Sequence, residues 1–311
     1  MAGPYAHITL LQELMRPGTY ESIFQPSSGL AKALAHYFPY CALGAVSPDY
    51  PNLAPADSSA PLWADAMHYT QSCKKIISGI GRTKNSVGDV KNKQIAWLLG
   101  YSAHVVTDMT IHPVVQARVG VYAGNQRQHR ICEMNQDSYI FHRLNLGEIG
   151  SSDIFADTVV TCSDTDNQYR LDSSIVELWE AMLNDVHPEL FRTHRPDSAL
   201  WHREFVTRFL ENKTGTAHLF PLAEVISEKM NLAYPAFDSI DMQYIDDQLV
   251  PSIPPLHIGY DEIFDHAVDN VAAVWKQIES AFCCEDPACL PVFGDWNLDN
   301  GLDENGILVF W

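Results

Sequence analysis

Basic residues are scarce in this sequence of 311 residues. Lys and Arg number 20 against 39 Asp and Glu, which gives a formal net charge of −19. A surface of that charge repels nucleic acid and anionic membranes unless a local patch or a bound cation reverses the field. The composition therefore argues against a nucleic-acid partner and favours a neutral or zwitterionic substrate. Bound cations would offset part of the negative charge.

Long apolar runs are also missing. No run is long enough to span a bilayer, so the sequence predicts no transmembrane segment. The first residues, MAGPYAHITLLQELM, lack the basic region and the long apolar stretch of a signal peptide. We expect a protein that stays in the cytoplasm, or that is exported without a cleavable signal or after its removal. Its contact with a membrane surface would then be transient.

Cysteine is too sparse and too scattered for a disulfide framework. The chain has seven cysteines, an odd number, and a protein of this size does not need such cross-links. We expect reduced thiols. The stretch CCEDPAC, residues 283–289, could hold a disulfide or a soft metal, but ordinary packing and surface positions are the favoured interpretation.

Apolar residues, in contrast, make up 46% of the chain, which is enough for a substantial core. Helical periodicity dominates, and no alternation typical of a sheet is present. We expect helices near residues 8–15, 30–38, 62–80, 89–111, 125–144, 173–183, 198–210, 216–230 and 260–282, with a long proline-rich connection at 39–61. The sequence thus predicts an all-α fold. Residues 1–283 would form the helical domain and 284–311 an acidic tail, either a short strand or an arm packed on the helices.

The stretch GYSAHVVTDMTIHPVV, residues 100–115, spaces His104, Asp108 and His112 four residues apart. Side chains at this spacing share one face of a helix but span about 12 Å. Zinc ligand bonds are only about 2.1 Å long, so the three residues would serve more than one ion, with Asp108 placed to bridge. Pro113 disfavours helical geometry at the preceding residue. We therefore expect His112 to turn away from the shared face, toward a second ion.

Further candidate ligands lie on both sides of this stretch. His129 and Glu133 are again four residues apart, so they can close on one ion together with His112. Three candidates lie upstream: His7 near the start, Asp49 in a rigid turn and His68 on a helix. A lone histidine on an apolar helix is more often a hydrogen-bonded core residue. The mixture of imidazoles and carboxylates over 133 residues favours metal, and zinc over calcium or magnesium.

This order of motifs resembles the zinc-dependent phospholipase C family. That family includes bacterial phosphatidylcholine phospholipases C and the catalytic part of GPI-specific phospholipase D and, more distantly, the P1/S1 nucleases. The resemblance rests on GAVSPD, a helical histidine, GYSAHVVTDMTIHP and HRICEMNQD, over about residues 5–140. It implies an all-helical fold around a multinuclear zinc site. Residues 150–311 match only as further helices.

The resemblance also implies three groups of ligands, all within residues 1–150. They are His68, His104 and Asp108, with Asp49 beside or on the ion, for one zinc; His112, His129 and Glu133 for a second; and His7 with a bridging Asp108 for a third. In secreted relatives an N-terminal tryptophan completes the third site, and no tryptophan begins this sequence. We therefore expect two to three zinc ions.

The expected activity is that of a zinc-dependent phosphodiester hydrolase of lipid metabolism. The favoured reaction is that of a phospholipase C, which cleaves a glycerophospholipid to diacylglycerol and a phosphorylated head group. Asp49 is the catalytic candidate, to orient or deprotonate the attacking water, although it could equally be a ligand. Two alternatives stay open. One is hydrolysis of another phosphoester, such as a nucleotide, a nucleic acid or a small metabolite. The other is a non-catalytic, zinc-stabilised binding protein.

Other residues near the candidate ligands could support the site. Asp65 and Asp137 lie one helical turn from His68 and Glu133, and each could fix an imidazole tautomer or simply be solvated. Four aromatic residues lie beside ligands and could line a head-group pocket or belong to the core: Tyr5, Tyr50, Trp63 and Tyr69. Residues 294–306 alternate Asp and Asn in a way that weakly resembles a calcium loop, but an acidic loop is favoured.

Overall fold

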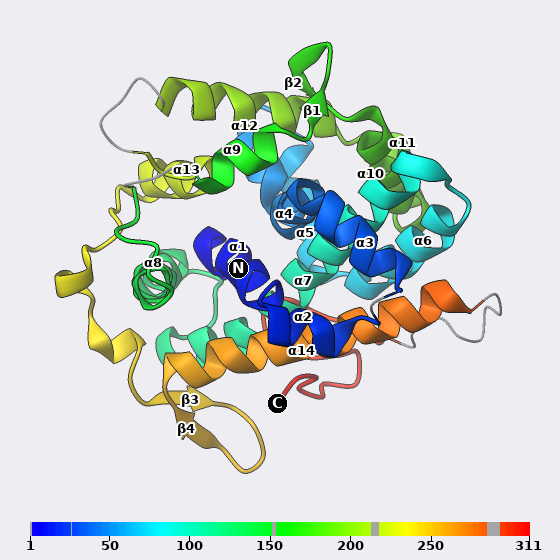
Figure 1. The fold of residues 1–311 in the computed structure, drawn as a ribbon. Helices are drawn as coiled ribbons and strands as arrows, with labels where there is room; N and C mark the ends of the chain where they lie inside the picture. Colours follow the sequence, from blue (N-terminus) through cyan, green and yellow to red (C-terminus); the bar gives the residue numbers. More distant parts are fainter. Residues whose placement is uncertain (1, 26, 151–153, 213–217, 285–292) are drawn as a thin grey trace.

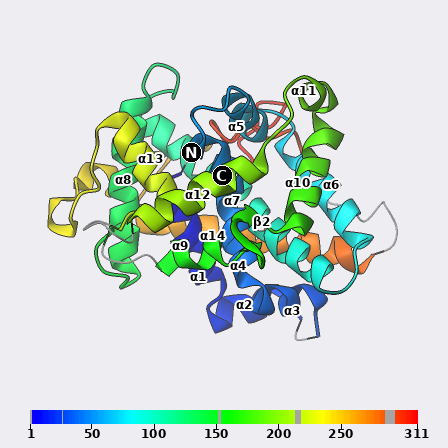
Figure 2. The same ribbon diagram turned by 90° about the horizontal axis from the view of Figure 1, so that it is seen from above.

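The computed structural model describes residues 2–25, 27–150, 154–212, 218–284 and 293–311. Within these ranges the chain forms fourteen α-helices and four short strands, which confirms the predicted all-α class. Seen from above, α8 and α13 lie on one side of the molecule and α6 and α10 on the other (Figure 2). No described helix is both long enough and apolar enough to cross a membrane.

Most of the helices follow one another with short connections, but residues 231–259 separate α13 from α14. In order they are α1 (Pro4–Leu14), α2 (Pro17–Ile23), α3 (Gly29–His36), α4 (Phe38–Val46), α5 (Ala60–Tyr69), α6 (Ser72–Lys84), α7 (Gly88–Val119), α8 (Gln126–Arg143), α9 (Ile154–Val160), α10 (Ser173–Val186), α11 (Pro188–Thr193), α12 (Ser198–Asn212), α13 (Pro221–Met230) and α14 (Tyr260–Cys283). Three short 3₁₀ helices accompany them: η1 (Ser47–Leu53), η2 (Phe237–Ser239) and η3 (Met242–Tyr244).

Helix α7 is the central helix of the fold. Every residue from Gln94 to Val115 is buried, because α3, α4, α6, α10 and α14 pack around it (Figure 1). Burial on all sides explains why most of these residues are apolar, apart from the candidate ligands and a few other polar side chains. The helix continues through Pro113 to Val119, so the expected turn at His112 is wrong. Tertiary packing overrides the local preference here.

Two glycines let α4 approach α7 at backbone distance. A side chain at Gly44 would overlap the carbonyl oxygen of Trp97, and one at Gly100 would overlap that of Cys41. The crossing also corrects the expectation of an irregular connection at 39–61, because this stretch contains α4 and η1. Its apolar run is buried, and a proline is tolerated in the first turn of a helix.

The expected single helix at 62–80 is in fact two helices. The chain breaks at Gln71, whose φ of 52° lies in the left-handed region. In the first turn of α6, just after the break, the buried Lys75 ammonium donates to the carbonyl oxygens of Ala66 and Thr70, at 2.7 Å each. These bonds satisfy carbonyls that the end of α5 leaves without helical partners. Burial lowers the pKa of Lys75 to about 7. The break ends α5 just after His68.

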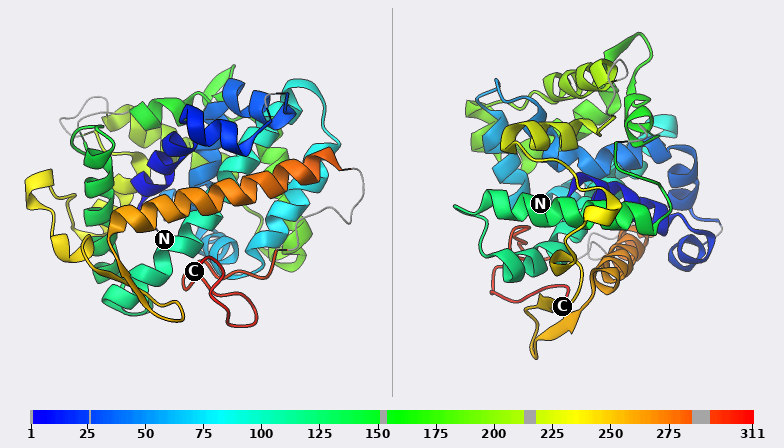
Figure 3. Two further views of the ribbon diagram at one scale, coloured as in Figure 1. Left: turned by 60° about the horizontal axis from the view of Figure 1, so that its bottom comes forward. Right: turned by 90° about the vertical axis from the view of Figure 1, so that its left-hand side faces the viewer.

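Four short strands form two antiparallel hairpins that the sequence analysis did not anticipate. Strand β1 (Ser163–Asp164) pairs with β2 (Asn167–Leu171), and β3 (Gln248–Val250) pairs with β4 (Leu256–Ile258). Residues 293–311 run along the outside of α7 and α14 (Figure 3). There the Trp311 indole donates to Thr110 O, and His266 Nε2 donates to Phe310 O. The division of the chain at residue 283 stays a prediction.

The expectation of reduced thiols holds for five cysteines, Cys41, Cys73, Cys132, Cys162 and Cys283. It is wrong for Cys284, which is disulfide-bonded. This residue belongs to the CCEDPAC stretch, whose Cys289 lies outside the described residues.

We predict that Gly100→Ala lowers the free energy of unfolding by about 3 kcal/mol, because the added methyl group must push α4 and α7 apart. The control is Gly81→Ala in α6, where a side chain would meet nothing within 4 Å. That change should stabilise the protein by about 0.5–1 kcal/mol, because alanine favours the helix. Urea denaturation of both variants tests the prediction, and equal midpoints would contradict it.

Candidate metal centre

Four elements bring six of the predicted ligands into one buried cluster. Helix α1 supplies His7, η1 supplies Asp49 and the end of α5 supplies His68. Helix α7 supplies the other three, His104, Asp108 and His112. All six side chains are nearly inaccessible to solvent. The cluster lies where α4 and α7 cross, so the close packing of those helices also positions the site.

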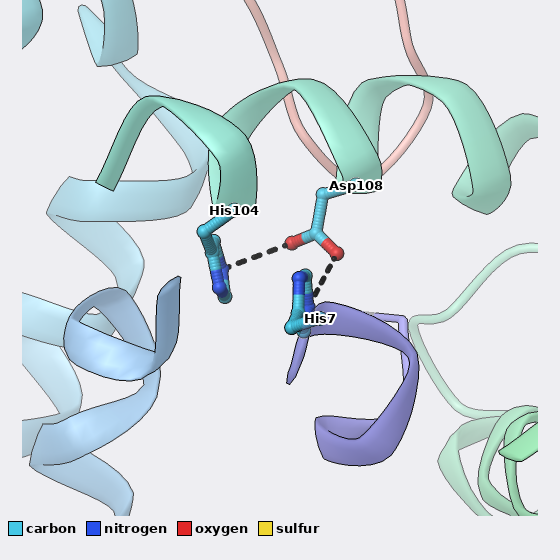
Figure 4. Close-up of side chains that lie close together, drawn as sticks. All are labelled: His7, His104 and Asp108. Atoms are coloured by element: carbon cyan, nitrogen blue, oxygen red, sulfur yellow. Dashed lines mark ion pairs between the residues drawn. The ribbon is translucent and has the colours of Figure 1, made fainter. Parts of the chain in front are cut away.

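Asp108 lies at the centre of the cluster. Its Oδ1 is 3.3 Å from His7 Nε2 and 3.4 Å from His112 Nε2. Its Oδ2 is 3.3 Å from His104 Nε2, so the carboxylate lies between the imidazoles of His7 and His104 (Figure 4). Burial alone would raise the pKa of Asp108, but His112 and His104 hold it well below its ordinary value. This is the position that the sequence spacing predicted for a bridging carboxylate.

Backbone carbonyls fix the tautomers of three histidines. Nδ1 of His68 donates to Ala64 O at 2.7 Å, and Nδ1 of His104 donates to Ala45 O at 2.8 Å. Nδ1 of His112 donates to Leu298 O at 2.6 Å. In a neutral imidazole the other nitrogen then carries a lone pair, and here each Nε2 faces the cluster. Such carbonyl bonds orient histidines for metal binding.

The Nε2 atoms of these three histidines and the carboxylate oxygens of Asp49 and Asp108 are therefore acceptors. One of these oxygens, Asp108 Oδ1, already receives a hydrogen bond from Ala2 N at 2.7 Å. His104 Nε2 lies 3.4 Å from His68 Nε2, which is 3.4 Å from Asp49 Oδ1. Asp49 Oδ1 and Asp108 Oδ2 receive no hydrogen bond of good geometry from the described residues. Buried acceptors without donors cost free energy, and protonated imidazoles would bring two positive N–H groups together. A divalent cation removes both penalties, so these residues fit zinc.

Two compact groups of possible ligands occur among the described residues. One consists of His7, His104 and Asp108, and the other of Asp49, His68 and His104. Within each group the ligand atoms lie within 4.8 Å of one another. Asp49 also stays ionised at neutral pH. Burial alone would raise its pKa, but His68 and His104 hold it at about 2.

The remaining predicted group, His112, His129 and Glu133, is also buried, but its ligand atoms lie further apart. His129 Nε2 donates to Gly120 O at 2.6 Å, which leaves Nδ1 directed toward Glu133 Oε1 at 4.0 Å. The other Glu133 oxygen accepts a 2.6 Å hydrogen bond from Arg130. Neither compact group includes these three residues. Their role as ligands of a second zinc stays a prediction, and Arg130 is a neighbour that the sequence analysis missed.

Asp137 supports the site differently from the sequence-based expectation. Its carboxylate accepts hydrogen bonds from the backbone of Ala6 at 2.8 Å and Tyr5 at 3.4 Å, so it caps the first turn of α1, which carries His7. A side chain at Gly3 would overlap this carboxylate, which explains the glycine. Burial raises the pKa of Asp137 to about 8. The expectation that it fixes an imidazole tautomer is wrong among the described contacts, where carbonyls take that role.

Two further expectations need correction. Asp65 is exposed, and the carbonyl of Ala64 holds the His68 ring in its place. Of the four aromatic residues, Tyr5, Tyr50 and Trp63 are buried in the core, and Tyr69 is the one exposed near the cluster. The three buried rings each pack against an aromatic ring of another helix.

A narrow cavity opens next to the cluster. It has a volume of about 20 Å³ and is lined by His68, Tyr69, His112, Tyr122 and Asp299. A cavity of this size holds about one water molecule. Gln116 donates to both the carboxylate and the carbonyl of Asp299 and so holds it at the rim. The sequence offered no sign of this contact, because Gln116 and Asp299 lie 183 positions apart.

The predicted acidic loop at 294–306 is folded on itself. The side chains of Asn297, Asn300 and Asp303 accept hydrogen bonds from backbone N–H groups two residues further along. These Asx turns use the oxygens that a calcium ion would need. Neither compact ligand group of the described chain lies in this segment.

The fold and the cluster together define an all-α protein with a buried centre of histidines and carboxylates that fits metal. The sequence profile described as "Zinc dependent phospholipase C" matches residues 6–189, which is more than half of the chain. The chain therefore belongs to the zinc-dependent phospholipase C family, which confirms the resemblance and places the protein in a family of hydrolases. No curated protein and no solved structure matches. The matched region contains every predicted ligand but not Asp299.

We predict that Asp137→Asn removes a pH dependence of stability. With a folded pKa of about 8 against an ordinary value of 3.8, the native state holds a proton that the unfolded chain releases. The free energy of unfolding should therefore fall as pH rises from 4 to 8, by up to about 1.4 kcal/mol per unit. The Asn variant keeps an acceptor for Ala6 N and lacks this slope.

Urea denaturation at several pH values measures the difference between the wild type and Asp137→Asn. Asp65→Asn, on the exposed face of α5, serves as the control and should keep the wild-type slope. If the slopes of the wild type and Asp137→Asn coincide, Asp137 is already ionised in the folded protein.

Proposed function

We propose that this protein is a zinc-dependent phosphodiester hydrolase, and specifically a phospholipase C. It would cleave a glycerophospholipid to diacylglycerol and a phosphorylated head group. The observation that carries the proposal is the convergence of buried lone pairs from His68, His104, Asp49 and Asp108. Membership of a phospholipase C family supports the same reaction.

The ligands would divide as the compact groups suggest. Asp49, His68 and His104 would hold one zinc, with Asp108 shared between this ion and its neighbours. His7 would contribute to a neighbouring ion beside Asp108. His112, His129 and Glu133 would hold a further ion, once Arg130 yields one oxygen of Glu133. This division describes three zinc ions per chain, the upper end of the expected two to three.

Bound zinc would supply Lewis-acid chemistry, which activates water and stabilises charge on phosphoryl oxygens. Asp49 is the residue proposed to act directly in the reaction. Its pKa of about 2 makes it a weak base, which supports a role in orienting water or ligating metal. The carbonyls of Ala45, Ala64 and Leu298 would keep three imidazoles in the ligating tautomer.

The residues at the rim of the cavity favour a substrate with a zwitterionic head group. Tyr69 and Tyr122 offer aromatic faces, and Asp299 offers a carboxylate. Aromatic faces and a carboxylate both attract a quaternary ammonium group. The net charge of −19 opposes nucleic acid, which would have to approach a surface of its own sign.

We predict that the wild-type protein contains about two to three zinc ions per chain and that Asp108→Ala loses at least one, because Asp108 is the shared carboxylate. Elemental analysis of protein purified without chelator or metal affinity measures the content. Asp65→Ala, on the same helix as His68 but exposed, should keep the wild-type content. A content of zero or one zinc in the wild type would rule out a multinuclear centre.

We also predict that the zinc-loaded protein hydrolyses phosphatidylcholine faster than single-stranded DNA or a small phosphate monoester. Release of phosphocholine, of nucleotides and of phosphate measures the three rates. Asp49→Asn should lower the lipid rate by about 10²-fold or more, if the carboxylate orients water. A preference for DNA would favour the nuclease alternative. Absence of all three activities in the zinc-loaded protein would favour a binding protein.

A further inference from the structure

The hairpin of β3 and β4 projects from the helical body beside the C-terminal segment (Figures 1 and 3). Its strands pair Val250 with Leu256, and residues 251–255 form the connecting loop, with the sequence PSIPP. The hairpin lies outside the region matched to the family. The reaction proposed above makes no use of it.

The tip of the hairpin is apolar and fully accessible. Ile253 is 101% exposed, the highest value among the large apolar side chains of the described residues, and Leu256 is 45% exposed. From Leu249 to Leu256 there is no charged residue, in a chain whose net charge is −19. Exposing such side chains to water is unfavourable unless they have a partner.

The backbone of the tip is also suited to a dry environment. Three of the five loop residues are prolines, which have no N–H group to leave unsatisfied. The Ser252 hydroxyl donates to Pro254 O at 2.9 Å and so satisfies one carbonyl within the loop. Prolines also restrict the loop before binding, which lowers the entropy lost on contact.

The base of the hairpin is rigid and polar. Val250 is buried, and the Gln248 side chain donates to the carbonyl oxygens of Gln243 and Asp246. His257 lies 3.0 Å from Asp247 at this level. The charged groups thus lie at the base of the hairpin and the apolar ones at its tip, which limits how deeply it can enter an apolar phase.

The hairpin adjoins the segment that forms the rim of the metal centre. Pro251, where the loop leaves strand β3, lines a surface depression together with Pro113, Gln116 and Asn300. Gln116 in turn holds Asp299 at the rim of the cavity. Two more exposed aliphatic side chains belong to segments that line the rim or follow it: Val121, next to Tyr122, and Ile307, beyond Asp299.

We propose that the β3–β4 tip inserts Ile253 and Leu256 into the surface of a phospholipid bilayer with net-neutral head groups. The inference rests on the proposed function, since a phospholipase must take its substrate from such a surface. A five-residue tip is too small for a stable protein interface, which needs about 800 Å² per partner. Asp246 and Asp247 at the base would repel anionic lipid.

Sedimentation with phosphatidylcholine vesicles tests the proposal on the full chain. The double variant Ile253→Ser, Leu256→Ser should bind at least about tenfold more weakly than the wild type, because two aliphatic side chains no longer leave water. Ile253→Trp should retain binding, since tryptophan favours the membrane interface. Replacing part of the lipid with phosphatidylglycerol should weaken binding of the wild type.

The control is Val87→Ser, which also replaces an exposed aliphatic side chain with serine. Val87 precedes the first turn of α7, at the end of the helix far from the hairpin. It should bind like the wild type. Hydrolysis of a short-chain, monomeric phosphatidylcholine should be the same in all variants, because the tip does not touch the metal centre. Hydrolysis of vesicles should fall in the double variant together with binding.

The proposal is overturned if the wild type does not sediment with neutral vesicles, or if the double variant sediments equally well. Concentration-dependent self-association of the wild type that the double variant abolishes, without vesicle binding, would assign the tip to contact between copies. Failure of the proposed function looks different. Neither monomeric nor vesicular lipid is then hydrolysed by the wild type, while the binding difference between the variants still supports the tip.

Discussion

The structure is organised around one buried carboxylate, Asp108, in the middle of its most buried helix. Three imidazoles direct lone pairs toward this carboxylate, and the ring of His7 lies 3.3 Å from it. Ala2 N donates to one of its oxygens, while the other receives no hydrogen bond from the described residues. Such an excess of acceptors is unstable in a dry interior unless a cation joins it. The free energy of metal binding would therefore contribute to the free energy of folding. Helices α1, α5 and α7 would be held together partly through the ions.

The helical scaffold supplies the positions of the ligands through contacts that carry no ligand themselves. Gly44 and Gly100 bring α4 against α7, and the same approach places the Ala45 carbonyl on His104. Lys75 closes the end of α5 below His68, and Asp137 caps the start of α1 ahead of His7. A change at any of these positions would reach the metal centre through the backbone. The helices and the centre thus form one cooperative unit.

The C-terminal segment belongs to the site as much as the helices do. The carbonyl of Leu298 accepts a hydrogen bond from the His112 ring and so fixes its orientation. The N–H of Leu298 donates to the backbone carbonyl of His68 at 2.9 Å. Asp299 narrows the opening. The region matched to the family ends more than a hundred residues earlier, so Asp299 is a residue of the opening that the match does not include. Substrate selection is therefore expected to depend on residues outside the shared core.

The sequence by itself determined the all-α class and the shared face of His104 and Asp108, because helical spacing and residue chemistry are local properties. The family, and the grouping of His7, Asp49 and His68 with these two residues, followed from the resemblance of the motifs and not from spacing. The sequence could not place the break at Gln71, the helix α4 within the proline-rich stretch or the straight course of α7 through Pro113, because burial against distant helices overrides local preference. Tertiary structure alone decided that carbonyls, and not Asp65 or Asp137, orient the histidines. It alone also brought Asp299 to the opening, since contacts across the whole chain leave no trace in local spacing.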